Sequence, residues 1–231
     1  MDIVRKVEII IERLSKLYPN PQLELKFENP FQLLVMAILA AQESDKKVNK
    51  VAEELFVELK EPDHFATLEV EELSERIKHV RWNHQKAQLI IKCCKKLLEL
   101  HDGKVPDDVE KLVKLPGVGR KTAHMVVGGA FHKPALITDR HFIRVANRLG
   151  LTKETKPEKV EKELSSKIPK KYWLKLSLLL IEHGKHICKA RNPLCEKCPL
   201  TDICDCYIQT GCEEYRTKTS RKKSKKKTSK E

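Results

Sequence analysis

The sequence contains no run of 18 apolar residues, and this absence excludes a membrane-spanning helix. The first residues, MDIVRKVEIIIERL, include acids and have the spacing of an amphipathic helix, so we expect neither a secretory signal nor a transit peptide. No pair of segments shows the apolar–polar alternation of strands. The 231 residues are therefore expected to form an all-α protein, as one large domain or two small ones. Because no secretory signal is expected, we expect the protein in a reducing compartment.

Helical periodicity runs through almost the whole chain. In 46–59 and 85–100 the apolar residues recur at i, i+3, i+4 and i+7. Asn29 and Pro30 are a typical helix start, and Gly103 is a typical stop. Further helices are expected at 3–17, 31–42, 70–79, 107–114, 119–130, 140–149, 157–167 and 170–183.

The positive charge is concentrated at the end of the chain. Residues 216–231 hold nine Lys and Arg against one Glu, so their net charge is +8. The whole chain has a net charge of +13, which leaves +5 for residues 1–215. Because this tail has no apolar residue to bury, we expect disorder there, from about residue 213. It could simply keep the protein in solution, or attract nucleic acid, or direct nuclear import.

A short segment, LPGVG (115–119), separates two expected helices, and Lys121 follows it directly. The pattern indicates a helix–hairpin–helix element. Its two glycines permit a tight turn and close approach of another molecule to the backbone. Free N–H groups at the following helix start form an anion site, for which phosphate is the natural ligand. An ordinary corner between two helices would show the same five residues.

Four cysteines are spaced C-x6-C-x2-C-x5-C, at Cys188, Cys195, Cys198 and Cys204. Four thiolates within seventeen residues can close on one metal centre, and sulfur ligands select zinc or an iron–sulfur cluster. Zinc sites more often pair two short Cys motifs across a longer gap, so this single compact loop favours a [4Fe–4S] cluster.

The other four cysteines lack this spacing. Cys206 and Cys212 follow the motif but break its pattern. Cys94 lies on an apolar helix face and is expected in the core, with Cys93 beside it and off that face.

LPGVGRKTA, then TDRH, then the four-cysteine motif resemble the endonuclease III family of DNA glycosylases. The likeness covers roughly residues 1–206 and includes ILAAQ, VNK, NPLCEKCPL and the eighteen-residue separation of Lys121 and Asp139. It implies two helical lobes: a six-helix barrel (24–134) with the hairpin, and an iron–sulfur lobe (1–23 with 135–212). DNA would lie in the cleft between the lobes, with a damaged pyrimidine flipped into a pocket.

The resemblance makes Lys121 the nucleophile. A free lysine has a pKa of about 10.4 and is therefore almost entirely charged at pH 7, whereas a nucleophile must be neutral. A helix N-terminus and partial burial both disfavour the ammonium, so this otherwise unfavourable position would activate the amine. By the same resemblance, Lys121 attacks C1′, expels the base and forms a Schiff base, and β-elimination then nicks the strand.

Further roles are implied by position in the family pattern. Asp139 would stabilise the sugar cation and help to deprotonate the lysine, or would only cap the next helix. Gln42 would fill the space left by the flipped nucleotide, or is merely a polar residue at a helix end. The residues expected to contact DNA are Gln42, Trp82, Gly117, Gly119, Arg120, Lys189 and Arg191.

The chain departs from the family pattern at two places. Arg81-Trp82-Asn83 stands where Gly, a bulky apolar residue and an aromatic are usual. Trp82 could still wedge into the duplex by stacking, or belong to the core. His124 stands where Asn is common and is interpreted as a helix-face residue. These departures leave the lesion and opposite-base preferences open.

Two alternatives remain at this point. A mismatch-directed thymine, uracil or adenine glycosylase would remove a base without nicking, but generally lacks this lysine. A noncatalytic DNA-binding module would need neither Lys121 nor Asp139. We expect a monomer that binds double-stranded DNA containing damaged bases or abasic sites and does not bind membranes. It would lie in the cytoplasm with the nucleoid of a prokaryote, or in the nucleus of a eukaryote.

Overall fold

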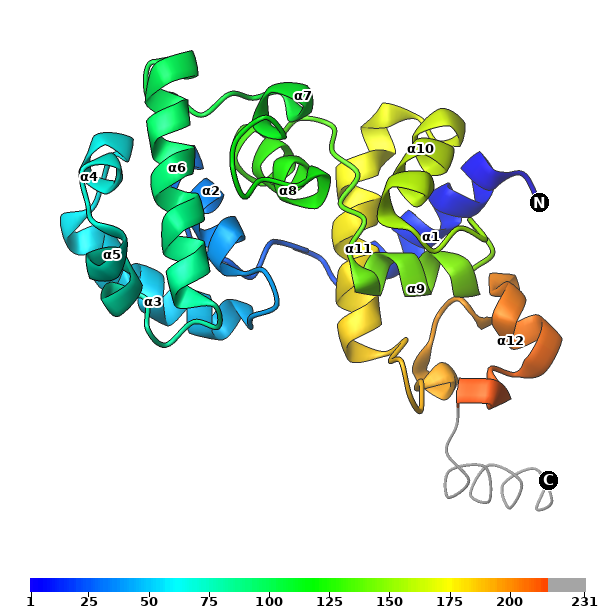
Figure 1. Cartoon of the computed structure of the whole chain (residues 1–231). Coiled ribbons are helices and arrows are strands. Elements are labelled where there is room, and N and C mark those ends of the chain that lie inside the picture. The colour runs from blue at the N-terminus through cyan, green and yellow to red at the C-terminus, as the bar shows by residue number, and fades with distance from the viewer. Residues whose placement is uncertain (216–231) are drawn as a thin grey trace. The chain divides into compact units, whose positions relative to one another are not determined.

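A computed structural model describes residues 1–215 (Figure 1). These residues form helices joined by short connections, and no strand is present among them, which confirms the all-α class. The α-helices are α1 (Ile3–Leu17), α2 (Pro30–Leu39), α3 (Asp45–Glu58), α4 (Pro62–Ala66), α5 (Val70–Arg76), α6 (Asn83–His101), α7 (Val109–Leu112), α8 (Arg120–Phe131), α9 (Arg140–Arg148), α10 (Pro157–Lys167), α11 (Trp173–His186) and α12 (Asp205–Thr210). The short helices α4 and α12 were not predicted.

The chain divides into two compact units. One is the continuous segment Gln22–Ala135, and the other joins Met1–Pro21 to the residues from Leu136 onward. The predicted barrel, 24–134, lies inside the continuous unit.

The continuous unit is built around α2, which is buried along almost its whole length. It packs against α3, α6 and α8, while α4 and α5 lie beside α6 (Figure 1). A Cβ on Gly129 of α8 would lie 2.5 Å from Leu23 Cδ1 and 2.9 Å from Leu33 Cδ2, so any larger residue there would require both leucine side chains to move.

Two helix ends in this unit follow the sequence signals. Asn29 caps α2 by accepting the Gln32 N–H at 2.9 Å, and Pro30 occupies the first helical position. At the end of α6, Asp102 and Gly103 adopt left-handed conformations, and the Gly103 N–H bonds to the Leu97 carbonyl at 3.2 Å.

The second unit is organised around α11, which packs against α1 and α9. Helix α1 is tied to the C-terminal segment by two ion pairs. Lys6 Nζ contacts Asp205 Oδ1 at 2.6 Å, and Arg13 contacts Asp202 at 2.5 Å. The N-terminal helix therefore completes a unit whose other parts follow residue 135.

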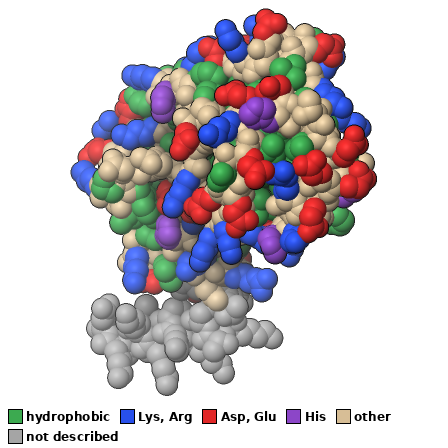
Figure 2. Space-filling view, turned by 90° about the vertical axis from the view of Figure 1, so that its left-hand side faces the viewer, with side chains coloured by type: hydrophobic (Ala, Val, Ile, Leu, Met, Phe, Trp, Pro, Cys, Tyr) green, Lys and Arg blue, Asp and Glu red, His purple; other side chains and the backbone are tan. Residues whose placement is uncertain are grey.

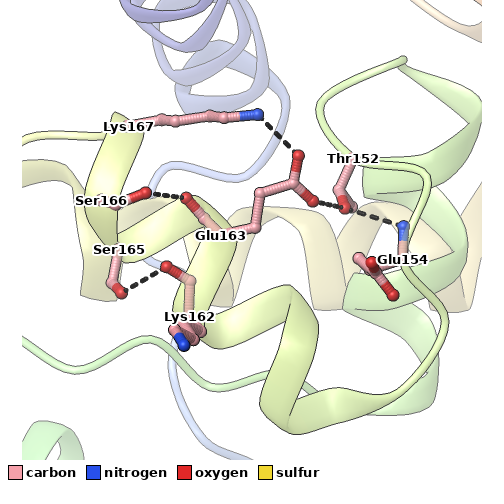
Figure 3. A network of polar contacts seen from close by, with 7 residues as sticks. All are labelled: Thr152, Glu154, Lys162, Glu163, Ser165, Ser166 and Lys167. Atoms are coloured by element: carbon pink, nitrogen blue, oxygen red, sulfur yellow. Dashed lines mark hydrogen bonds and ion pairs between the residues drawn. The ribbon is translucent and has the colours of Figure 1, made fainter.

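A polar network fixes α10 to the connection that follows α9 (Figure 3). Glu163 accepts from the Thr152 hydroxyl and from Lys167 Nζ, and the Thr152 oxygen accepts the Glu154 N–H at 3.0 Å. Lys167 and Thr152 lower the pKa of the Glu163 carboxyl, which therefore stays ionised and holds both partners.

The face that carries α4 and α5 has interspersed acidic and basic side chains (Figure 2). Some of them pair there, as Arg76 does with Glu58 and Glu72. This face therefore has no single-sign patch that would attract a polyanion.

The predicted tail falls mostly outside the described residues. Its first three residues, Glu213–Tyr215, instead form a 3₁₀ helix, and the Tyr215 ring lies 3.8 Å from the Arg148 guanidinium carbon. The expectation of disorder from residue 213 is therefore wrong for these three residues, because Tyr215 has a packing partner.

Candidate functional site

The hairpin connects α7 to α8 and takes its shape from Gly117. This residue has a φ of 79°, and the turn is closed by the Val118 N–H, which donates to the Leu115 carbonyl at 3.1 Å. A Cβ at Gly117 would lie 3.2 Å from Leu89 Cβ and 3.5 Å from Ile38 Cγ2. Both the backbone conformation and the tight packing therefore require glycine here.

At Gly119, neither the backbone conformation nor the packing requires glycine. Its backbone is extended, it forms the N-cap of α8, and no heavy atom lies within 4 Å of the position of a Cβ. The first N–H groups of α8 have no carbonyl partner four residues earlier. The start of α8 therefore places backbone N–H groups at the positive end of a helix, beside the open space at Gly119, which suits a phosphate.

Lys121 is the second residue of α8 and is exposed. Partial burial was expected to help activate its amine, and that expectation is wrong for the free protein. Its neighbour Arg120, expected to contact DNA, forms an ion pair with Glu110 at 2.9 Å. A phosphate at the hairpin would compete with Glu110 for this guanidinium.

Asp139 is the N-cap of α9, as one of its two interpretations requires. Its Oδ1 accepts the Phe142 N–H at 2.7 Å. This contact engages one oxygen, and a carboxylate has two, so capping is compatible with a further role. The side chain is only partly buried.

Gln42 and Trp82 lie in two loops of the continuous unit and are both exposed. Trp82 is 62% exposed, so its interpretation as a core residue is wrong. Asn83 donates to the Ser74 hydroxyl at 3.0 Å, whereas Arg81 and Trp82 are the exposed side chains of RWN. His124, in contrast, is buried at 5% exposure on the inner side of α8.

The four motif cysteines line one pocket in the second unit, together with Arg148 and His183. No three His, Cys, Asp or Glu side chains within residues 1–215 converge closely enough to hold a single metal ion. Cysteines that each bind a separate iron of a cluster need not converge so closely. The residues present fit the cluster, because four sulfur donors share one pocket with a cation.

Arg148 is the residue that shapes the first cluster loop. Its guanidinium donates to the Lys189 carbonyl at 2.7 Å, to the Ala190 carbonyl at 3.1 Å and to Cys188 Sγ at 3.3 Å. Lys189 and Arg191 are exposed on this loop, as expected of residues that contact DNA. No sequence pattern points to Arg148, since a charged helix residue usually faces solvent.

His183 is a second contact to the cysteines that was missed. It is buried, and its Nε2 lies 3.3 Å from Cys198 Sγ. Burial lowers the pKa of His183 to about 4, so its imidazole is neutral near pH 7 and, with the proton on Nε2, donates to the sulfur.

The remaining cysteines differ partly from expectation. Cys94 is buried as predicted, but Cys93 is buried as well, so its assignment off the apolar face is wrong. Burial raises the pKa of the Cys93 thiol to about 12, which makes it unreactive. Cys206 and Cys212 are bonded to each other as a disulfide.

The fold and the site are those of a class of DNA repair protein. Residues 35–170 match the HhH-GPD superfamily of base excision DNA repair proteins, and residues 188–204 match the iron–sulfur binding domain of endonuclease III. Within the described residues, no helix has the length and apolar character needed to cross a membrane.

Curated relatives narrow the class to one family. The chain is 44% identical to an endonuclease III of Rickettsia conorii, over 87% of this chain and 96% of the relative. It is 37% identical to an endonuclease III of Thermotoga maritima, over 93% of this chain and all of the relative. It also matches the solved structure of a trapped endonuclease III–DNA covalent intermediate, with 37% identity, a TM-score of 0.83 and coverage of 89% of this chain and 97% of that one. The chain belongs to the endonuclease III family.

A solved thermostable thymine-DNA glycosylase also shares the fold, with a TM-score of 0.80 at 23% identity. At that identity the likeness concerns the fold alone. The fold alone therefore does not identify the reaction, and the site residues must decide it.

Proposed function

We propose that the protein is a bifunctional DNA glycosylase and abasic-site lyase that removes damaged pyrimidines from duplex DNA, with Lys121 as its nucleophile. One observation carries the proposal: Lys121 lies two residues after Gly119, in the first turn of the helix that follows the hairpin, where the space beside Gly119 is open. This arrangement occurs in a chain that resembles, over most of its length, an enzyme trapped covalently on DNA.

The proposed chemistry needs a neutral amine and a stabilised sugar cation. The Lys121 amine bonds to C1′ as the base leaves with the electrons of the glycosidic bond. The sugar ring opens to a Schiff base, and loss of a proton from C2′ expels the 3′ phosphate. Asp139 stabilises the positive charge that develops on the sugar and accepts the lysine proton.

The cluster has a positioning role in this proposal. The residues that would hold it are Cys188, Cys195, Cys198 and Cys204. When bound, it would fix the loop between its first two ligands, and Arg148 also holds the backbone of that loop. Lys189 and Arg191 are thereby presented to DNA phosphates. We propose that the protein acts as a monomer.

A panel of duplexes tests the function. Strands carrying thymine glycol, uracil, a G·T mismatch or an abasic site are incubated with the protein and resolved on denaturing gels. Nicking at thymine glycol and at the abasic site is the expected result. Base loss that leads to a break only after alkali would instead indicate a monofunctional mismatch glycosylase. Binding without base loss would refute both.

The role of the first cluster loop gives a separate prediction. Replacing Lys189 and Arg191 together by alanine should weaken binding to every duplex alike. The slope of log Kd against log salt concentration should fall by about 1.8, because each phosphate contact contributes about 0.9. A titration by fluorescence anisotropy at several salt concentrations measures this slope.

The matched control removes two exposed lysines elsewhere in the same unit, Lys171 and Lys175. This variant loses the same charge, so it separates local contacts from net charge. An equal fall in slope in both variants would show that Lys189 and Arg191 make no specific contact.

A further inference from the structure

Gln42 and Trp82 are held by two loops that share one unusual backbone feature. Both residues have a φ of 57°, in the left-handed region that residues other than glycine seldom adopt. Such conformations persist only where the surrounding structure holds them. Both side chains nevertheless project into solvent. The contacts that fix these loops therefore lie in the residues next to Gln42 and Trp82.

Glu43 is the residue that joins the two loops. Its Oε2 accepts the Arg81 N–H at 3.0 Å, across 38 residues of sequence, and its Oε1 accepts the Ser44 N–H at 3.1 Å. Lys47 Nζ lies 3.4 Å from Oε2. The Glu43 side chain is only 9% exposed, although its partners Arg81 and Ser44 are exposed residues. One carboxylate thus binds the residue after Gln42 to the residue before Trp82.

Lys86 fixes the same two loops from the protein interior. It is buried, and its Nζ donates to the Leu39 carbonyl at 2.7 Å, at the C-terminal end of α2. Its backbone N–H donates to the Trp82 carbonyl at 2.8 Å. The loop that carries Gln42 begins at the end of α2, and the loop that carries Trp82 leads into α6. Lys86 therefore anchors the base of both loops, while Glu43 joins them near their tips.

The pKa of the Glu43 carboxyl is lowered, chiefly by the Arg81 N–H and also by Ser44 and Lys47. The carboxyl therefore stays ionised throughout the neutral range. Hydrogen bonds to an ionised acceptor are stronger than those between neutral groups.

We propose that Glu43 is a positioning residue that couples the two loops, so that Gln42 and Trp82 enter an opened duplex together. This inference rests on the proposed function, in which these side chains occupy the space left by a flipped nucleotide. Filling that space with two side chains requires a fixed separation between them. The Glu43–Arg81 contact sets this separation without touching DNA itself.

The test uses a duplex with an abasic site opposite 2-aminopurine, whose fluorescence rises when it is unstacked. With saturating full-length protein, two quantities are measured: the fluorescence rise and the single-turnover rate of strand cutting. Glu43→Asp keeps the charge but shortens the reach, whereas Glu43→Gln keeps the reach and an acceptor oxygen. We expect Glu43→Asp and Glu43→Ala to lower both quantities about tenfold and Glu43→Gln to remain within about threefold of wild type.

A double-mutant cycle with Trp82→Ala measures the coupling directly. If the loops act as one unit, Glu43→Ala/Trp82→Ala should be no slower than the slower single variant. Glu54→Ala is the matched control, because it removes an exposed carboxylate from α3 with the same change in net charge. Melting temperatures are recorded for every variant, and Glu43→Asp serves as the milder change if Glu43→Ala unfolds.

Three results would overturn the coupling: Glu43→Ala equal to Glu54→Ala, full additivity with Trp82→Ala, or Glu43→Gln slower than Glu43→Asp at unchanged melting temperature. Failure of the proposed function looks different. Wild-type protein would then cut no abasic strand at all, while the fluorescence of 2-aminopurine would still report whether the loops open the duplex.

Discussion

Lys121→Gln should lose strand cutting at abasic sites by about 10³-fold or more, because the nucleophile is removed and no neighbouring group replaces it. The variant should also fail to be trapped on abasic DNA by borohydride, since trapping requires a Schiff base to a lysine amine. Denaturing gels of the protein with a labelled abasic duplex measure both effects. DNA affinity should change little, because Lys121 is one of many cations near the duplex.

Lys92→Gln is the matched control for this prediction. Lys92 is an exposed lysine on α6, in the same unit, and the substitution removes the same charge. It should cut and trap like wild type. If Lys121→Gln still forms the trapped complex, another amine is the nucleophile, and the proposed mechanism fails.

Cys195→Ala should remove the iron–sulfur cluster and destabilise the unit that contains it. Cys195 is buried among the other cysteines, and loss of one ligand opens a site that metal binding helps to fold. We expect loss of the absorbance band at about 400 nm and a fall in unfolding free energy of about 4 kcal/mol or more. An absorbance scan measures the first effect, and equilibrium unfolding in a series of urea concentrations measures the second.

Cys94→Ala provides the comparison. Cys94 is also buried, but lies in the continuous unit, away from the metal motif. It should keep the full absorbance band and lose only about 1 kcal/mol, the effect of a small cavity. A Cys195→Ala protein with an undiminished band would show that Cys195 is not a cluster ligand.

Much of the fold could be predicted from the sequence, because long amphipathic helices carry a strong periodic signal. The helices around 46–59 and 85–100 appear as α3 and α6, and Asn29 and Gly103 mark helix ends as expected. The short helices α4 and α12 were missed, because five or six residues are too few to show a helical period. The prediction that Cys93 lies off the apolar helix face was wrong, because α6 is buried on more than one side.

The residues of the site could be predicted where their spacing in the sequence indicates their role. The four cysteines share a pocket, and Asp139 caps α9 as one of its interpretations required. Arg148, Glu43 and Lys86 could not be found in this way, because their partners are backbone groups distant in sequence. A carbonyl or an N–H looks the same at every residue, so nothing in the sequence points to such contacts. The catalytic and DNA-binding roles of the individual residues stay predictions, which the experiments described above test.

The division of the chain also bears on its synthesis. The segment 22–135 contains everything that its unit needs, so it can fold while the ribosome is still adding later residues. Helix α1, although made first, must wait for Asp202 and Asp205 before its two ion pairs with the C-terminal segment can form. Iron can therefore be inserted only when the chain is nearly finished. A nascent chain cut short before residue 188 would hold a folded hairpin and no ligand for the metal.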